Sequence, residues 1–511
     1  MKFVPVLSLL ALCVMSTTAM AQDAACSAMA NWSDGAGDLQ ITEAKYYTDR
    51  TMPAGPGGPG VQLPPHCHVM GSFEQRTGSD GRPYAIKFAI NMPATWNGRY
   101  LFQGGGGLNG VIREPVGNQN AGSRSALAQG FAVVSNDSGH ESSGFDSSWM
   151  KDQQALLNFQ YQANAKVVEQ TRPMVEAYFQ KATDHSYFLG CSTGGREGMI
   201  MAQRFPFLFD GIVSGAPAMR TGVSNLALRW FSVEMGKAAN TKPRDPFTEA
   251  EEKLIMDGLL ARCDALDGQA DGLIFNRGAC DFDPRQLSCS VKGGNACLAD
   301  DKAQALASAI GGPLTSSGIP VYVSFPWDTG LDDSAGLPGL LIAGGSPPEG
   351  LNGADMQSQN VEAEYIAATA GDEALGSTAT LYNVSDYVAK GGKHLFYHGE
   401  SDPWFSANET ERYFNAMAEA NAWVKPVEDY GRLYLVPGMA HCAGGAQTVD
   451  SFDILTPMVE WVEQNKPPQS LVATGRSMPG QSRPICPYPS YAHFDGGDAA
   501  LATSYSCRVP E

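Results

Sequence analysis

Apolar residues between positions 84 and 215 fall into short runs that alternate with longer stretches of helical spacing. Short apolar runs bounded by Gly, Asn or Asp are typical of buried strands, and apolar residues three or four apart indicate helices. The pattern predicts strands over Tyr84–Met92, Arg99–Gln103, Gly130–Ser135, Ser186–Gly190 and Asp210–Gly215, and helices over Leu156–Tyr178 and from about Gly195 through Met201. Strands that alternate with helices favour a parallel sheet in an α/β protein.

The alternation stops at about Arg220, and the chain up to Gly376 is rich in Gly, Asp and Cys with helical patches such as Thr248–Leu260. Two further apolar strands follow, over Lys393–His398 and Arg432–Val436, with room for a helix between them over roughly Glu409–Ala420. We interpret the middle stretch as an insertion between two late strands of the sheet. Residues 22 to about 65 are rich in Gly and Pro, which predicts an irregular N-terminal arm.

The first residues have the composition of a secretory signal peptide. Lys2 precedes an apolar run over Phe3–Met15, and Ala19-Met20-Ala21 gives the small-x-small cleavage pattern. No later stretch is long and apolar enough for a transmembrane helix, so we expect no membrane partner. The net charge of −19 repels phosphate backbones, which argues against a nucleic-acid partner. We therefore expect a secreted or periplasmic protein.

Cysteine usage agrees with export. Once Cys13 is removed with the signal peptide, ten cysteines remain, and an even number in an exported chain suggests disulfides. Local pairing predicts the bonds Cys26–Cys67, Cys263–Cys280, Cys289–Cys297 and Cys486–Cys507, and leaves Cys191 and Cys442. A zinc site is the rival interpretation, but the chain holds no CxxC pair.

The pentapeptide Gly190–Gly194 fits the G-x-S-x-G pattern with Ser192 at its centre. An apolar strand precedes it and a helix follows it, which is the setting of a nucleophile elbow. The glycines permit the tight turn that exposes the serine hydroxyl. The alternative is an ordinary Gly-rich strand-to-helix turn.

A serine nucleophile needs a base and an orienting acid, in the chain order Ser, Asp or Glu, His. Asp402 follows the strand over Lys393–His398, and His441 follows the strand over Arg432–Val436, so both lie at C-terminal strand ends, where open α/β sheets place active sites. Glu400 is a rival acid. We interpret His398 as structural and His140 as a residue that organises its loop.

The oxyanion hole requires backbone N–H groups. The amide of Thr193, directly after the nucleophile, is one candidate, and Gly106 or Gly107 in the Gly-rich loop after an early strand is the other. No Lys-Ser or Lys-Thr follows that loop, which argues against a P-loop.

Cys191 directly precedes Ser192, and Cys442 directly follows His441. If the serine and the histidine are hydrogen-bond partners, their neighbours are also close. A disulfide between the two cysteines would tie nucleophile to base and would close a very long loop.

The combination Cys191-Ser192, Asp402 and His441-Cys442 resembles the signature of the tannase and feruloyl esterase family. The resemblance extends from Cys67 to Cys507. It implies an α/β-hydrolase core with an inserted lid, and hydrolysis of esters of aromatic acids. The implied division is a signal peptide over residues 1–21, the first part of the core over 22–219, a lid with a calcium site over 220–376, and the second part of the core over 377–511.

The lid of this family usually holds a structural calcium ion. The matching stretch runs from Cys263 to Leu273 and offers Asp264, Asp267 and Asp271, whose carboxylates are hard oxygen ligands that suit Ca²⁺. The resemblance implies that the carbonyl groups of Gln269 and Leu273 complete the site. The alternative is a solvated acidic loop. We expect no cofactor for catalysis itself.

The expected substrate is a small aromatic ester, either free or attached to a plant polysaccharide or polyphenol. A feruloyl ester is the substrate that we favour. Phe405 matches an aromatic position in relatives and predicts a wall of the binding slot, and Phe325 and Trp327 either contribute to it or pack in the core. Relatives that cleave mono(2-hydroxyethyl) terephthalate grip its carboxylate with a lid arginine. This chain has no Lys or Arg between Lys302 and Lys390, which favours a neutral feruloyl or galloyl ester.

Three alternatives accompany this hypothesis: an esterase of the terephthalate monoester or tannase type, a peptidase or acyltransferase with the same triad, and a binding protein without activity on a hydrolase scaffold. Intact Ser192, Asp402 and His441 argue against the last.

Overall fold

A computed structural model describes residues 20–33, 35, 37–52, 60–117, 124–238, 247–294, 296–332, 359–375 and 381–510. Almost all of the predicted signal peptide lies outside these residues. The chain divides into two compact units, one ending at Leu189 and the other beginning at Gly190. Among the helices in the described ranges, none combines the length and the apolar character needed to cross a bilayer.

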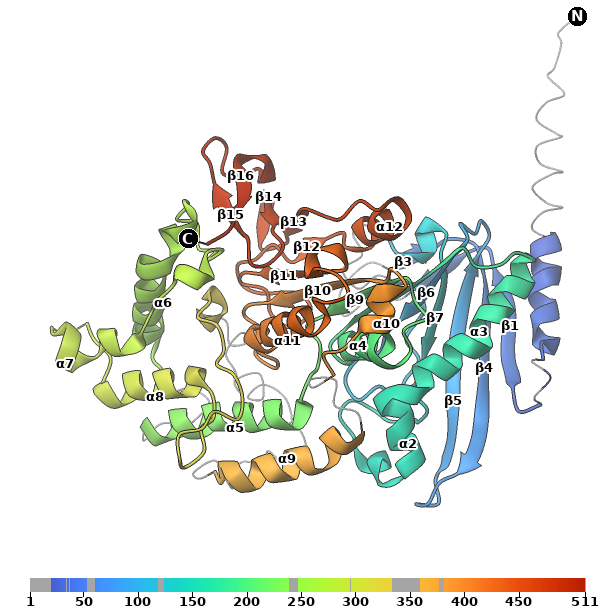
Figure 1. Cartoon of the computed structure of the whole chain (residues 1–511), viewed down its shortest axis with the longest axis horizontal. Coiled ribbons are helices and arrows are strands. Elements are labelled where there is room, and N and C mark those ends of the chain that lie inside the picture. Colours follow the sequence, from blue (N-terminus) through green and yellow to red (C-terminus); the bar gives the residue numbers. More distant parts are fainter. Residues whose placement is uncertain are drawn as a thin grey trace, which may run out of the picture. The chain divides into compact units, whose positions relative to one another are not determined.

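The first unit holds a mixed sheet with the strand order β1-β4-β5-β7-β6-β8. Its strands are β1 (Gln40–Tyr47), β4 (His66–Thr77), β5 (Pro83–Pro93), β6 (Arg99–Gln103), β7 (Ala132–Asn136) and β8 (His185–Cys191), and a small ladder pairs β2 (Arg50–Met52) with β3 (Val61–Leu63). Strands β6, β7 and β8 are parallel, whereas β1, β4, β5 and β7 pair antiparallel. The short helix α2 (Gln153–Leu157) and the long helix α3 (Ala163–Phe179) follow β7, and α3 lies across the long strands in Figure 1.

Two predictions for this unit are wrong. The arm over residues 22–65 is not irregular throughout, because β1 forms there and pairs with β4. Strand β1 has mixed polar and apolar residues, so its edge position in the sheet, and not a run of buried residues, makes it a strand. The sheet is also not purely parallel. Only residues 78–82 separate β4 from β5, and so short a connection permits an antiparallel pair only.

The second unit contains the parallel strands β9 (Gly211–Gly215), β10 (Lys393–Gly399) and β11 (Gly431–Val436), close to their predicted bounds. Helix α4 (Thr193–Arg204) follows β8, and α11 (Ala407–Asn421) connects β10 with β11. The other elements here are α10 (Ser385–Ala389), α12 (Leu455–Gln464), the three-stranded sheet β12 (Ser451–Phe452), β13 (Leu471–Gly475) and β14 (Met478–Ile485), and the pair β15 (Tyr491–Phe494) and β16 (Tyr505–Arg508).

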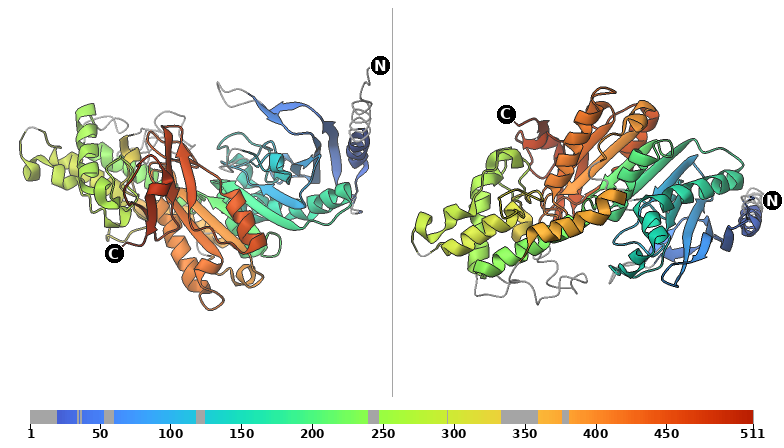
Figure 2. Two further views of the ribbon diagram at one scale, coloured as in Figure 1. Left: turned by 90° about the horizontal axis from the view of Figure 1, so that it is seen from above. Right: turned by 60° about the horizontal axis from the view of Figure 1, so that its bottom comes forward.

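The predicted insertion is mostly helical in its described part. It holds α5 (Thr221–Ala238), α6 (Glu249–Cys263), α7 (Cys289–Lys292), α8 (Asp300–Gly311) and α9 (Val361–Leu375). These helices group to one side of β10 and β11 in Figures 1 and 2. Helix α6 begins with a capping box between Thr248 and Glu251, which satisfies backbone N–H groups at its start. The insertion has a hydrophobic cluster of its own, which includes Phe325, with Trp327 packed against it.

The structure forms all four local disulfides that were predicted. It also joins Cys191 to Cys442, across a sequence separation of 251 residues. This bond ties the turn between β8 and α4 to the loop after β11.

Candidate active site

Ser192 occupies the sharp turn between β8 and α4. Its backbone has φ +63° and ψ −125°, a left-handed conformation that is costly for a residue with a side chain. Three backbone hydrogen bonds hold this turn: the Ser192 amide donates to Gly215, and the Ser192 carbonyl accepts from Arg196 and Ala218. A strained serine between a strand and a helix has the geometry of a nucleophile elbow.

Asp402 and His441 lie in direct contact. The imidazole Nδ1 of His441 is 2.6 Å from Asp402 Oδ2. Because a carboxylate oxygen only accepts, Nδ1 carries the proton, and Nε2 is left with a lone pair for a hydroxyl group. The carboxylate is fully buried, whereas the histidine side chain is 20% exposed. The pair therefore combines a buried orienting acid with an accessible base.

Four hydrogen bonds converge on the Asp402 carboxylate. Oδ1 accepts from the amides of Trp404 and Phe405, and Oδ2 accepts from His441 and from His398. Burial alone raises the pKa of Asp402, but the charge on His441 and the hydrogen bonds from both histidines outweigh it and hold the pKa well below its ordinary value. Asp402 is therefore ionised throughout the range in which an esterase works.

His398 is a second histidine in contact with the Asp402 carboxylate. Its Nε2 is 3.2 Å from Asp402 Oδ2 and 2.9 Å from the carbonyl oxygen of Phe405, and its Nδ1 is 2.8 Å from Thr410 Oγ1. The two acceptors around Nε2 require the proton there, so Nδ1 accepts from the Thr410 hydroxyl. The sequence interpretation of His398 as structural omitted this contact with the acid.

We expect His398→Ala to lower kcat by about 10-fold, because loss of one hydrogen bond of about 1–1.5 kcal/mol leaves Asp402 less well held. Loss of this donor also raises the pKa of Asp402 toward its ordinary value and strengthens the hydrogen bond that the carboxylate accepts from His441. The acid limb of the kcat/KM profile should therefore move to higher pH, and His398→Gln should restore it, since the glutamine amide donates from a similar position. An identical profile in His398→Ala and wild type contradicts this role.

Glu400, the rival acid, has other partners. Its Oε1 is 3.4 Å from Arg277 Nε, and its Oε2 is buried with no hydrogen-bond partner among the described residues. Burial raises the pKa of Glu400 to about 8, with Arg277 opposing the shift. His140 belongs to the first unit, where its ring stacks on Trp149 and its Nε2 bonds the carbonyl oxygen of Leu108. Burial lowers the pKa of His140 to about 4.

A residue of the insertion bridges the loop of the acid and the loop of the base. Asp328 Oδ2 accepts from the hydroxyl of Ser401 at 2.5 Å and from the amide of Gly438 at 2.7 Å. Ser401 directly precedes the acid, and Gly438 lies in the loop that carries His441. No motif in the sequence indicates this aspartate, because its partners are 73 and 110 residues away.

Two aromatic rings lie against the base. The Trp404 ring stacks on the His441 ring at 5.9 Å, and the Phe405 ring centroid is 5.6 Å from it. Phe405 is 6% exposed, and Trp404 is half-buried. Phe405 is the aromatic residue that the sequence predicts here, whereas the adjacent Trp404 carries no sequence signal of its own. Trp327 contacts Phe282 edge to face, so it packs within the insertion together with Phe325.

The remaining predicted residues lie in two loops. Thr193 begins α4, directly after Ser192, whereas Gly106 and Gly107 follow β6 in the first unit, and their role in an oxyanion hole stays a prediction.

The three aspartates of the predicted calcium loop cap its backbone amides: Asp264 accepts from residues 271 and 272, Asp267 from 269 and 275, and Asp271 from 273. Asp271 also pairs with Arg483 at 2.5 Å.

Strands, helices and the elbow of Ser192 define the class of protein: the chain has an α/β fold of the hydrolase type. The family model described as "Tannase and feruloyl esterase" matches residues 67–343 and 350–508. The chain belongs to this family and is an ester-hydrolysing enzyme.

The chain is 32% identical to mono(2-hydroxyethyl) terephthalate hydrolase of Piscinibacter sakaiensis, over 96% of this chain and 92% of that protein. It is 26% identical to feruloyl esterase B of Aspergillus niger, over 81% and 82%. The solved structure of feruloyl esterase B from Aspergillus oryzae superposes with a TM-score of 0.78 at 22% identity, covering 95% of this chain and all of that one. Tannin acyl hydrolase from Aspergillus niger gives a TM-score of 0.72 at 21% identity, over 96% and 95%.

Proposed function

We propose that this chain is an exported serine esterase that cleaves esters of aromatic acids through an acyl-enzyme on Ser192. Feruloyl esters are the substrates that we favour. The observation that carries the proposal is the hydrogen bond of 2.6 Å between His441 Nδ1 and Asp402, together with the disulfide from the residue before Ser192 to the residue after His441. The five disulfides of the described cysteines support export into an oxidising compartment.

In the proposed mechanism, Ser192 Oγ attacks the ester carbonyl carbon while His441 Nε2 takes the hydroxyl proton. Asp402 holds the ring and stabilises the positive charge that His441 acquires. The amide of Thr193 stabilises the oxyanion, and the sequence pattern offers Gly106 or Gly107 as the second donor. The C–O bond to the alcohol then breaks, and His441 gives its proton to the leaving oxygen. A water molecule, deprotonated by His441, attacks the acyl-enzyme; the bond from the acyl carbon to Ser192 Oγ breaks, His441 returns the proton to Oγ, and the aromatic acid leaves.

The aromatic pair beside the base supports an aromatic acyl group. Trp404 and Phe405 lie against the His441 ring, where the acyl part of a bound ester must be positioned. The absence of Lys and Arg between Lys302 and Lys390 removes a cation that could pair with a second carboxylate on the substrate. Both features favour a neutral hydroxycinnamoyl or galloyl ester over a terephthalate monoester.

Comparison of kcat/KM for methyl ferulate, methyl gallate and the terephthalate monoester tests the substrate class. We expect the order ferulate, gallate, terephthalate monoester. Ser192→Ala should abolish turnover of all three. A preference for the terephthalate monoester supports the alternative substrate, and binding of all three without turnover in the wild type supports a scaffold without activity.

We also propose that the loop from Asp264 to Leu273 holds a structural Ca²⁺. Its donor set fits a hard cation: three carboxylates and two peptide carbonyl groups within ten residues, with Asp264 and Asp267 buried. Burial raises the pKa of Asp267 to about 7, and the charges of Asp271 and Asp264 add to the shift. A bound cation would relieve this repulsion. Asp264, Asp267 and Asp271 would hold the ion, with the carbonyl oxygens of Gln269 and Leu273.

We expect removal of Ca²⁺ by a chelator to lower the Tm, because an ion at about 100 times its Kd stabilises the folded state by about 2.7 kcal/mol. Asp267→Asn should abolish the response to added Ca²⁺. Asp257→Asn is the matched control, since that carboxylate is exposed on α6 and pairs with Lys253 outside the loop. Equal Tm values with chelator and with excess Ca²⁺ contradict the site.

A further inference from the structure

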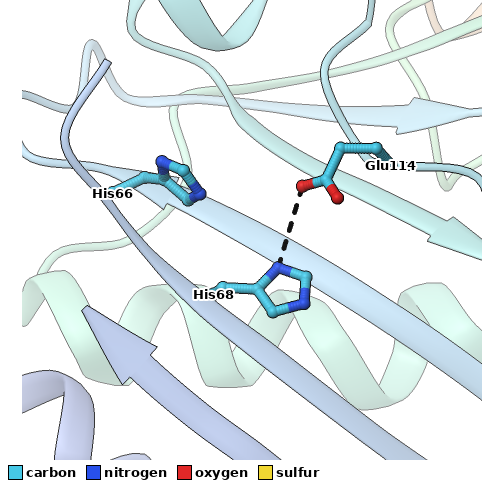
Figure 3. Close-up of side chains that lie close together, drawn as sticks. All are labelled: His66, His68 and Glu114. Carbon is cyan, nitrogen blue, oxygen red and sulfur yellow. Dashed lines mark ion pairs between the residues drawn. The ribbon is translucent and has the colours of Figure 1, made fainter. Parts of the chain in front are cut away.

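Two histidines and a glutamate form a second cluster of ligating side chains, in the first unit and outside the residues discussed above. His66 and His68 lie two residues apart on β4, so the alternation of side chains along a strand places both rings on one face. Glu114 approaches from the loop after β6. Within the described residues, these three side chains each offer one ligand atom, and the three atoms all lie within 4.8 Å of one another. Figure 3 shows the two rings and the carboxylate turned toward a common centre.

The ring of His66 presents an unused lone pair to this centre. Its Nδ1 is 2.7 Å from the carbonyl oxygen of Pro64, which only accepts, so Nδ1 carries the proton. Its Nε2 is buried with no hydrogen-bond partner among the described residues, and the residue is 0% exposed. A buried nitrogen acceptor without a donor costs free energy unless another group occupies the site. This atom points between His68 and Glu114 in Figure 3.

Asn91 forms hydrogen bonds to both of the other candidate ligands and so fixes their positions. Its amide nitrogen donates to Glu114 Oε1 at 2.8 Å, and its carbonyl oxygen accepts from His68 Nδ1 at 2.6 Å. His68 Nδ1 is 4.0 Å from Glu114 Oε1. The second carboxylate oxygen, Oε2, pairs with Arg50 at 2.8 Å. Glu114 can thus keep its ion pair through Oε2 and offer Oε1 to a metal.

We propose that His66, His68 and Glu114 form a binding site for a divalent transition-metal ion of the Zn²⁺ type. Two imidazoles and one carboxylate are a ligand set that such ions use, with a fourth position for water or another oxygen. His68 binds through Nδ1 once its proton moves to Nε2, so the ring stays neutral and no net proton is released. Asn91 Oδ1, which gives up its hydrogen bond, becomes available to a metal-bound water.

The structure defines what binding requires. Ligand atoms around a tetrahedral Zn²⁺ lie about 3.3 Å apart, so ligand atoms now up to 4.8 Å apart must approach by up to about 1.5 Å. The guanidinium of Arg50 opposes a cation, which limits the affinity. The ion would tie the loop of Glu114 to β4, whose Cys67 is already bonded to Cys26. We therefore expect a structural ion that stabilises this edge of the sheet.

Titration with Co²⁺ tests the proposal, in Ser192→Ala protein with excess Ca²⁺ to occupy the lid loop. We expect one Co²⁺ per chain with visible d–d bands of a four-coordinate ion, displaced by Zn²⁺. Loss of an outer partner of a metal ligand costs about 10–100-fold in affinity, so His66→Gln and Glu114→Gln should each weaken binding by more than about 100-fold. His185→Gln, a half-buried histidine outside the cluster, is the matched control and should bind like the parent.

Folding of each variant is checked by its urea midpoint in the presence of a chelator, which should equal that of the parent. If His66→Gln fails to fold, Glu114→Gln alone decides. Absence of a Co²⁺ site in the parent, or equal affinity in the parent and a folded cluster variant, overturns the proposal. Neither outcome depends on the esterase activity.

Discussion

We expect Asp402→Asn to lower kcat by about 10⁴-fold, since a buried aspartate that orients a catalytic histidine contributes on that order. The asparagine amide presents a nitrogen donor where the carboxylate now accepts from His441 and His398 or from the amides of Trp404 and Phe405. It also carries no charge to stabilise the imidazolium. Steady-state kinetics on a chromogenic aryl ester measures the loss.

Glu400→Gln is the control, because Glu400 is two residues from Asp402 and was the rival acid. Burial raises the pKa of Glu400 to about 8, so at pH 7 it is mostly neutral and glutamine is a close match in shape and charge. We expect kcat within about 3-fold of wild type. A larger loss in Glu400→Gln than in Asp402→Asn would assign the acid to Glu400 and contradict our interpretation.

The second large effect concerns the Cys191–Cys442 disulfide. Replacing both cysteines with serine should lower the free energy of unfolding by about 5.5 kcal/mol, because the bond closes a loop of 251 residues in the unfolded chain. Removal of Cys289–Cys297, which closes 8 residues, should cost only about 2.5 kcal/mol in the same model. Denaturant midpoints of the two double variants provide the comparison.

The kcat values of the two double variants should also differ. Loss of Cys191–Cys442 frees the turn of Ser192 from the loop of His441, so we expect kcat to fall as well. Loss of Cys289–Cys297, which lies in the insertion, should leave kcat unchanged. Equal effects of both removals on stability and on kcat would show that the long-range bond has no special part in holding the site.

The sequence predicted those parts of the molecule that depend on local pattern. The strands β5, β6, β8, β10 and β11 lie within a residue or two of their expected bounds, because each has a central run of apolar residues and Gly, Pro or Asn lies near its ends. The elbow of Ser192 follows from glycines at fixed positions, and the order Ser192, Asp402, His441 follows from strand ends. The five disulfides follow from proximity along the chain and from the flanks of the triad.

Contacts between distant residues escaped prediction. Strand β1 lacks a continuous apolar run, and its pairing with β4 joins residues about 19 to 32 positions apart along the chain. Asp328 reaches Ser401 and Gly438 only after the insertion has folded against the loops. His398 looked structural because its position before the acid carries no motif. The sequence contains the His66-x-His68 pair of the proposed metal site, but Glu114, the third proposed ligand, is 46 residues away from His68 along the chain.

The central claim, that Ser192 carries an acyl group during turnover, is tested most directly by mass spectrometry of protein quenched during hydrolysis of an activated feruloyl ester. We predict one feruloyl group per chain, on the peptide that contains Cys191 and Ser192, and none in Ser192→Ala. A wild-type enzyme that turns over the ester with no acylated peptide, or with the acyl group on another residue, would contradict the account.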